Sequence, residues 1–97
     1  MQGYLQRVDS QQGLIFRDHV IELYAVLKRN ILVLFDSKEN GNVVGRVHMQ
    51  IATLAPVRST DNDCDFRLNS GLVELCLRAP SIGDKCQWHN ALSDAIR

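Results

Sequence analysis

The sequence predicts a small, mainly β fold, a sandwich or barrel closed by one C-terminal helix. Short apolar runs separated by turn-forming residues recur over residues 3–79, as is typical of antiparallel strands joined by tight connections. In the C-terminal segment the apolar period changes from two to about 3.6. The residues at positions i, i+3, i+4 and i+7 of this segment are Trp88, Ala91, Leu92 and Ala95. A helix with one such apolar stripe is expected to cover an apolar opening left by the strands.

The first three strands are predicted between residues 3 and 35. Gly3–Val8 forms a short strand, and the turn formers of Asp9–Gly13 end it. Two β-branched runs between Val20 and Phe35 flank Lys28–Asn30, which indicates a hairpin. Along the first of these runs, alternation with a period of two places one set of residues on the face expected to point inward, namely Ile21, Leu23, Ala25 and Leu27.

The remaining elements are strands separated by polar connections, followed by the helix. In chain order they are a loop over Asp36–Asn42, a strand over Val43–Met49, a weak strand over Ala52–Val57, a loop over Arg58–Asp63, and strands over Asp65–Leu68 and Leu72–Ala79. Asn69, Ser70 and Gly71 predict the turn of the last hairpin. Ser81, with Asp84 three residues later, resembles the Ser-x-x-Glu capping box and marks the start of the helix.

Length and composition fit one folded domain over residues 1–97. Hydrophobic residues make up 45% of the chain, which excludes a disordered composition. The 11 basic residues balance the 11 acidic ones, so no field of the whole molecule attracts nucleic acid, and any anion site must be local. Because no apolar run approaches the roughly 20 residues that span a bilayer, we expect no transmembrane segment.

The sequence carries no pattern typical of catalysis or of metal or cofactor binding. Cys64, Cys76 and Cys86 form an odd set without a CxxC pair, which disfavours a disulfide framework and a zinc site and favours a reducing, cytoplasmic compartment. Alternation along the last strand turns Cys76 outward. The three histidines lack metal-ligand spacing, and no glycine-rich nucleotide motif is present. We therefore expect a binding module that is not an enzyme and holds no metal or cofactor.

Five short segments occur in an order that is typical of one known family. They are Gly3–Arg7 (GYLQR), Tyr24–Leu27 (YAVL), Ile31–Phe35 (ILVLF), Gly45–Met49 (GRVHM), and Leu75–Ala79 (LCLRA) with Trp88 nine residues beyond it. Over Gly3–Arg97 the chain resembles the pleckstrin-homology (PH) family. The resemblance implies a seven-stranded antiparallel barrel or sandwich capped by one C-terminal α-helix, with binding loops at the other end. We also expect the chain to be one module of a larger protein.

The resemblance also implies a position for a binding site. Family members that bind phosphoinositides use basic residues at the end of the first strand, in the second strand and in two nearby loops. The matching candidates for an anionic headgroup in this chain are Arg7, Arg17, His19 and Lys38. At the two positions of the second strand where strong binders carry basic residues, this chain has Leu23 and Ile21. Since one charge-assisted hydrogen bond contributes about 1.5–3 kcal/mol, these replacements predict weak binding.

The expected function is that of a non-enzymatic membrane-targeting or adaptor module. Its expected partners are anionic membrane phospholipids, either a phosphoinositide or phosphatidic acid, which it would bind weakly. We expect the protein to be cytoplasmic and peripheral to the membrane. Acidic residues accompany the candidate bases and would partly neutralise them: Asp9, Asp18, Asp36 and Glu39. The alternative therefore stays open that the domain recognises a protein partner through the same fold, without physiological lipid binding.

Overall fold

The computed structural model describes residues 1–10, 18–56, 63–71 and 73–96, and its strands form one sheet. The seven strands follow the order β4-β3-β2-β1-β7-β6-β5, and every paired neighbour is antiparallel. The elements are β1 Gln2–Ser10, β2 Asp18–Lys28, β3 Ile31–Phe35, β4 Val43–His48, the 3₁₀ turn η1 Met49–Ile51, β5 Ala52–Leu54, β6 Asp65–Ser70, β7 Val73–Arg78 and α1 Ile82–Ile96. This arrangement confirms the predicted seven-stranded antiparallel fold with one C-terminal helix.

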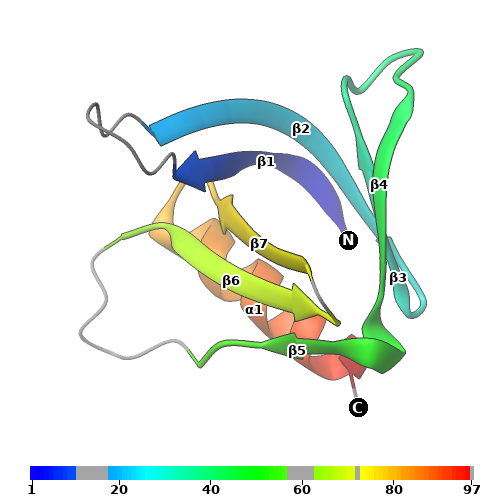
Figure 1. Cartoon of the computed structure of the whole chain (residues 1–97), viewed down its shortest axis with the longest axis vertical. Helices are drawn as coiled ribbons and strands as arrows, with labels where there is room; N and C mark the ends of the chain where they lie inside the picture. Colours follow the sequence, from blue (N-terminus) through cyan, green and yellow to red (C-terminus); the bar gives the residue numbers. More distant parts are fainter. Residues whose placement is uncertain (11–17, 57–62, 72, 97) are drawn as a thin grey trace.

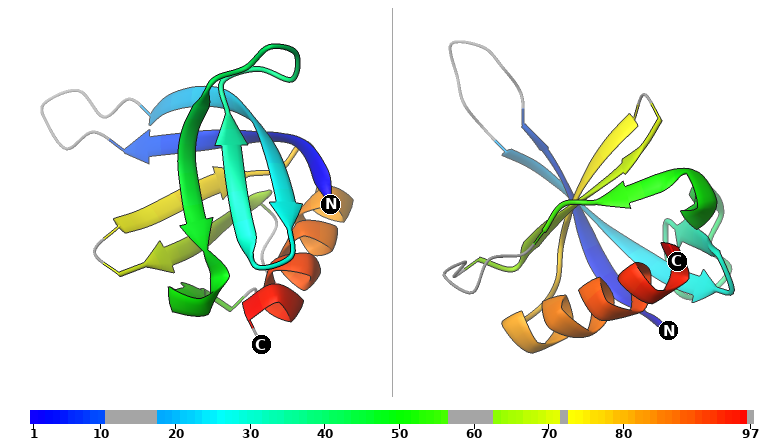
Figure 2. Two further views of the ribbon diagram at one scale, coloured as in Figure 1. Left: turned by 90° about the vertical axis from the view of Figure 1, so that its right-hand side faces the viewer. Right: turned by 90° about the horizontal axis from the view of Figure 1, so that it is seen from below.

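The sheet curls so that its two halves face one another across the core. β1 and β2 are the longest strands and bend over the top of the molecule, with β5, β6 and β7 below them and β3 and β4 at one side (Figure 1). The helix α1 lies along one end of the barrel (Figure 2). At the opposite end lie the end of β1, the start of β2 and the turn between β6 and β7. The barrel is therefore closed by the helix at one end and open at the other.

Trp88 closes the helical end. Its side chain is 2% exposed, and a Cβ added to Gly3 on β1 would lie 3.8 Å from the indole ring. An aromatic ring of this size fills space that no other part of the chain can occupy. The core around it consists mainly of Leu5, Leu23, Ala25, Leu32, Leu34, Val47, Met49, Phe66, Leu68, Leu75, Leu77 and Leu92. The predicted stripe is thus internal packing.

The inner face of β2 follows the predicted alternation, except at Ile21. Leu23 and Ala25 are buried and Leu27 is partly buried, whereas Ile21 remains 40% exposed. The reason is the unequal length of the strands: β3 pairs with β2 only from Tyr24 onward, so the part of β2 that contains Ile21 extends beyond β3. Ile21 therefore lies at the rim and Leu23 lies in the core.

The local boundaries also follow from the residues. Ser81 caps α1, because its Oγ accepts a hydrogen bond of 3.1 Å from the backbone N–H of Asp84 and donates one of 3.1 Å to the Asp84 carboxylate. In β7 the predicted alternation is confirmed, since Leu75 and Leu77 are buried while Cys76 is only partly buried on the other face. The weak strand ends at residue 54, earlier than predicted, and Val57 lies outside the described residues.

Candidate binding site at the open end of the barrel

A cavity of about 220 Å³ is bordered by residues near the ends of strands β1 and β6. These strand ends lie at the end of the barrel opposite α1 (Figure 2). Strands from both halves of the sheet contribute to it: β1, β2, β3 and β4 on one side, and the ends of the β6–β7 hairpin on the other. The described residues that border it are Arg7, Leu23, Leu34, Val44, Gly45, Arg46, Val47, Ser70 and Leu75. None of these residues is acidic, and Arg7 lies on the same face of its hairpin as Leu23, so the cavity combines apolar walls with one positive charge.

Arg7 is the predicted candidate that borders this cavity. It lies near the end of β1, where it pairs with Ile21 of β2 on one side and with Leu77 of β7 on the other. The residue is exposed, and its guanidinium carries five N–H donors, so it can contact more than one partner at a time. Arg7 therefore supplies a hydrogen-bond donor of fixed charge at the mouth of the barrel.

Arg46 of β4 also borders the cavity, but it alternates with the buried Val47 and pairs with Val33, so its side chain lies on the outer face of the strand. The pairing of β3 with β4 shifts register between Leu34 and Phe35, which leaves Val44 as an extra residue in β4. Val44 is 53% exposed and borders the cavity. The only sequence signal for this site is Gly45, the residue at which an irregular strand is tolerated.

Lys38 lies on the opposite face of the sheet from the cavity. Its Nζ atom is 6.0 Å from the centre of the Tyr24 ring, a distance at which a cation is attracted to an aromatic face. Tyr24 packs edge-to-face against Tyr4, its cross-strand partner, with ring centres 5.2 Å apart. Tyr24 alternates with Leu23 along β2, so Lys38 and Arg7 are held on different faces of the β1–β2 hairpin.

The connection that carries Lys38 is a closed loop. The backbone N–H of Asp36 donates to the carbonyl of Asn42 at 3.0 Å, and the Asn42 N–H donates to the Asp36 carboxylate at 2.8 Å. Gly41 is required here, because a Cβ at this position would lie 2.1 Å from the carbonyl oxygen of Ser37. The ends of the loop are thus fixed by hydrogen bonds within it.

The other two predicted candidates are only partly described. Arg17 lies outside the described residues. The backbone of His19 pairs with Asp9 at the start of β2, and its side chain lies outside the described part of the structure.

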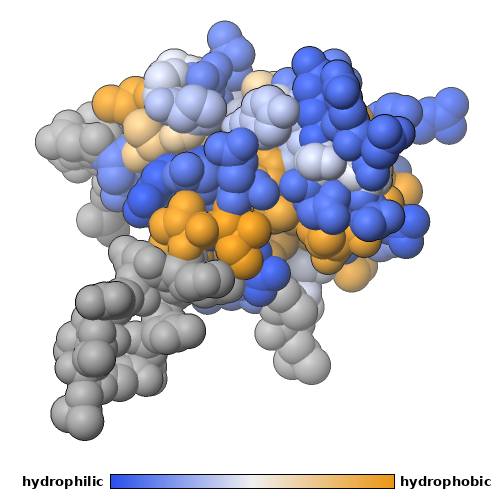
Figure 3. Space-filling view, turned by 90° about the horizontal axis from the view of Figure 1, so that it is seen from above, coloured by the Kyte–Doolittle hydropathy of each residue, from blue (hydrophilic) through white to orange (hydrophobic). Residues whose placement is uncertain are grey.

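Figure 3 shows the upper face of the molecule, on which apolar residues reach the surface among hydrophilic ones. The exposed apolar residues on β2 and β4 are Val20, Ile21, Val43 and Val44.

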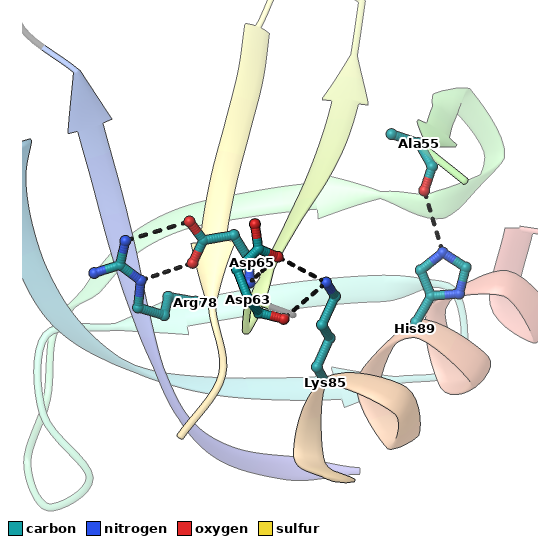
Figure 4. Close-up of polar contacts among 6 residues, drawn as sticks. All are labelled: Ala55, Asp63, Asp65, Arg78, Lys85 and His89. Atoms are coloured by element: carbon teal, nitrogen blue, oxygen red, sulfur yellow. Dashed lines mark hydrogen bonds and ion pairs between the residues drawn. The ribbon is translucent and has the colours of Figure 1, made fainter. Parts of the chain in front are cut away.

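Two further basic residues have structural roles (Figure 4). Arg78 of β7 donates two hydrogen bonds, of 2.7 and 3.3 Å, to the carboxylate of its cross-strand partner Asp65. Lys85 of α1 is 2% exposed, and its Nζ donates to the carbonyl and the carboxylate of Asp63 at 3.1 and 3.0 Å. The hydrogen bond from Lys85 lowers the pKa of the Asp63 carboxyl below its ordinary value. These contacts tie the start of β6 to the helix and to β7.

Two of the other cavities have acidic residues on their walls. One cavity, of about 330 Å³, is bordered by Asp63 and Asp65, and burial raises the pKa of the Cys76 thiol that also borders it. Another, of about 320 Å³, is bordered by Glu22 and by Arg78, which is already bound to Asp65. Of these three cavities, the one at the mouth is thus the most favourable for a negative group.

Within the described ranges no three His, Cys, Asp or Glu side chains are placed to share a metal ion. None of the helices among these residues has the length and apolar character that crossing a bilayer requires.

The open-ended barrel with its capping helix and mouth cavity agrees with the comparison to known families, in which the model of the PH domain matches residues 1–97. The chain belongs to the PH domain family.

Solved structures of other PH domains have the same fold. The PH domain of ArhGAP27 is 22% identical, with a TM-score of 0.75 over 100% of this chain and 99% of that one. The PH domain of Slm1 in complex with inositol-4-phosphate is 18% identical, with a TM-score of 0.76 over 100% of this chain and 94% of that one. The PH domain of ORP8 is 21% identical, with a TM-score of 0.73 over 100% and 96%. A search of curated proteins found no significant match.

Proposed function

We propose that this PH domain is a non-enzymatic membrane-targeting or adaptor module that binds anionic phospholipid headgroups weakly at the mouth of the barrel. The observation that carries the proposal is the composition of the mouth cavity, which has Arg7 and no acidic residue among its described residues. Exposed Ile21, the cross-strand partner of Arg7, can enter the interface of a bilayer while Arg7 meets phosphate. The protein would act in the cytoplasm as a peripheral membrane protein.

The weakness of the binding follows from the second strand. Strong phosphoinositide binders of the family carry basic residues where this chain has Ile21 and Leu23, and Leu23 is here 5% exposed and part of the core. A polyphosphorylated headgroup needs several donors, and each missing charge-assisted hydrogen bond lowers affinity roughly ten- to a hundredfold. We therefore propose a lipid with one phosphate in the headgroup, such as phosphatidic acid, ahead of a polyphosphoinositide.

The related structures support a ligand of this class. Slm1 was crystallised with inositol-4-phosphate and with phosphoserine, and the C-terminal PH domain of pleckstrin with an inositol pentakisphosphate. These ligands share phosphate groups as their charged feature. By analogy with them, we propose that Arg7 contacts phosphate. Arg17 and His19 are further candidates, whereas Lys38 lies on the face of the β1–β2 hairpin opposite the cavity.

A second function is favoured by the edge of the sheet. β4 is a terminal strand in the sheet order, and its exposed Val43 and Val44 stand on that edge. An exposed edge strand can bind an extended peptide by strand addition. A related structure contains SifA together with SKIP, two different proteins. The alternative proposal is therefore a protein-interaction module of the PH fold that does not bind lipid physiologically.

Vesicle sedimentation tests the main proposal. Neutral vesicles, vesicles with phosphatidic acid and vesicles with a phosphoinositide are compared at several salt concentrations. We expect binding to both anionic types, decreasing with salt because it is electrostatic. Arg7→Gln should weaken it, whereas Arg67→Gln, which removes the same charge at an exposed site on β6, should not. An equal effect of both variants, or no binding at any salt concentration, would favour the protein-recognition alternative.

A further inference from the structure

The mouth cavity differs from a simple anion site because four buried apolar side chains border it. Leu23, Leu34, Val47 and Leu75 surround it and are each 8% exposed or less. The polar groups that border it are the two arginines and Ser70. Phosphate or sugar hydroxyls placed between such walls would lose their hydrogen bonds to water without replacement. The interior of the cavity therefore favours a hydrocarbon group, and its rim favours an anion.

The size of the cavity fits a short stretch of hydrocarbon. An apolar protein cavity of about 150 Å³ holds one benzene molecule, with six carbons. By the same ratio, the 220 Å³ at the mouth of this barrel has room for roughly nine carbons. Gly45 forms part of the wall, and its lack of a side chain leaves space beside Leu34. This volume can hold part of one acyl chain and is much too small for a whole two-chain lipid.

We propose that the mouth of the barrel binds a single-chain anionic amphiphile, such as a lysophosphatidic acid or a fatty acid. Its acyl chain enters between Leu23, Leu34 and Leu75, and its acidic group remains at the rim beside Arg7. The inference rests on the lipid-binding proposal above in using the same mouth and the same arginine, and it specifies the class of lipid. Charge complementarity supports this occupant, because the described lining carries positive charge only.

An apolar peptide side chain would fill the cavity less well. It would bring polar backbone groups to the rim, where the described lining offers the Arg7 side chain and Ser70. Arg7 also has contacts within the protein, but its five N–H donors allow it to bind an acidic group in addition. The amphiphile satisfies both parts of the site with one molecule.

Titration with alkyl phosphates of increasing chain length tests the inference. Ethyl, butyl, hexyl, octyl, decyl and dodecyl phosphate are each measured by isothermal titration calorimetry below their micelle-forming concentration. We expect affinity to rise by about fourfold per methylene while the chain fills the cavity, and to level off beyond about nine carbons. Affinity that is independent of chain length, or that rises without levelling off, would overturn the inference.

A cavity-filling variant gives an independent readout. A Cβ at position 45 would lie 3.6 Å from Leu34 Cδ1, an ordinary contact, so Gly45→Ala is tolerated and Gly45→Leu is expected to fill the cavity. Gly45→Leu should weaken decyl phosphate at least tenfold and Gly45→Ala by a smaller factor. Val43→Leu, which adds a methylene on the same strand outside the cavity lining, should have no effect. An unchanged affinity in both folded Gly45 variants would contradict the proposed location of the chain.

The same variants separate this inference from the proposed function. If Gly45→Leu loses decyl phosphate and still sediments with phosphatidic acid vesicles like the wild type, both proposals are supported. If wild type binds vesicles but no alkyl phosphate, the acyl-chain inference fails and the lipid-headgroup function stands. If it binds decyl phosphate with the expected length dependence but no vesicle, the membrane function fails and the amphiphile site stands.

Discussion

Replacing Ile21 by arginine is expected to strengthen binding to phosphoinositide vesicles about tenfold or more. Ile21 is the cross-strand partner of Arg7, so the two Cβ atoms lie about 4.5–5.5 Å apart. Two guanidinium groups at this spacing can contact the same phosphate. One added charge-assisted hydrogen bond contributes about 1.5–3 kcal/mol, which corresponds to a factor of roughly ten to a hundred in affinity.

The substitution should leave the fold intact. Ile21 is 40% exposed, so a long arginine side chain can reach solvent without opening the core. Its positive charge opposite Arg7 is expected to cost about 0.2–1 kcal/mol of folding stability. For a domain of this size such a loss lowers the melting temperature by a few degrees, about 4–8 °C per kcal/mol. Circular dichroism and thermal melting check this before binding is measured.

The assay is sedimentation with phosphoinositide vesicles, and Val20→Arg is the matched control. Val20 precedes Ile21 in β2, is 38% exposed and points to the opposite face of the strand, so its substitution adds the same charge away from the cavity. We expect a gain for Ile21→Arg well above that for Val20→Arg. A folded Ile21→Arg domain that binds no better than Val20→Arg would refute the reasoning that Arg7 marks a phosphate site.

Three further predictions concern stability. Trp88→Ala should destabilise the domain by about 3–5 kcal/mol, seen as a large fall in the melting temperature, because the end of the barrel cannot collapse into the space left by the indole. Gly41→Ala should cost about 1–3 kcal/mol in chemical denaturation, since its Cβ would overlap the Ser37 carbonyl, and a wild-type value would contradict the loop geometry. The Asp63–Lys85 bond lowers the carboxyl pKa, so its stabilisation is present above pH 3.8 and is lost as the pH falls through the folded-state value. Asp63→Asn should therefore be less stable than wild type at neutral pH, with the difference narrowing below about pH 4 in acid titrations of unfolding, and a constant difference would oppose this assignment.

Sequence periodicity predicted the fold because strands and helices repeat their apolar residues with different periods, of two and about 3.6 residues. The change of period before Trp88 identified α1, and alternation along β7 gave the correct phase, with Leu75 and Leu77 inside and Cys76 outside. The capping residue Ser81 gave the helix start, since its hydroxyl bonds to the first turn. These features are local, so the sequence of each segment contains the information that decides them.

The site was harder to predict because it depends on how strands overlap. Alternation placed Ile21 and Leu23 on one inner face, but strand length decides which of them reaches solvent, and β3 begins its pairing only at Tyr24. A register shift beside Leu34 places Val44 at the cavity. No short sequence motif predicts this shift. Likewise, the loop carrying Lys38 folds toward Tyr24. This contact depends on the tertiary structure and could not be predicted from the local sequence.

The distribution of the basic residues explains how a chain with no net charge could bind an anionic surface, and why it would bind weakly. Arg78 and Lys85 are held by Asp65 and Asp63 within the fold, so their charge is largely neutralised where it stands. Among the described lining residues Arg7 is the cation that faces the mouth, and a single cation contributes only about 1 kcal/mol near an acidic membrane. Such a site holds a protein at a membrane for long only when a second contact acts with it, because linked weak sites gain affinity from their effective concentration. A hydrocarbon chain seated in the mouth cavity would be one such contact, since it adds apolar burial to the charge at the rim.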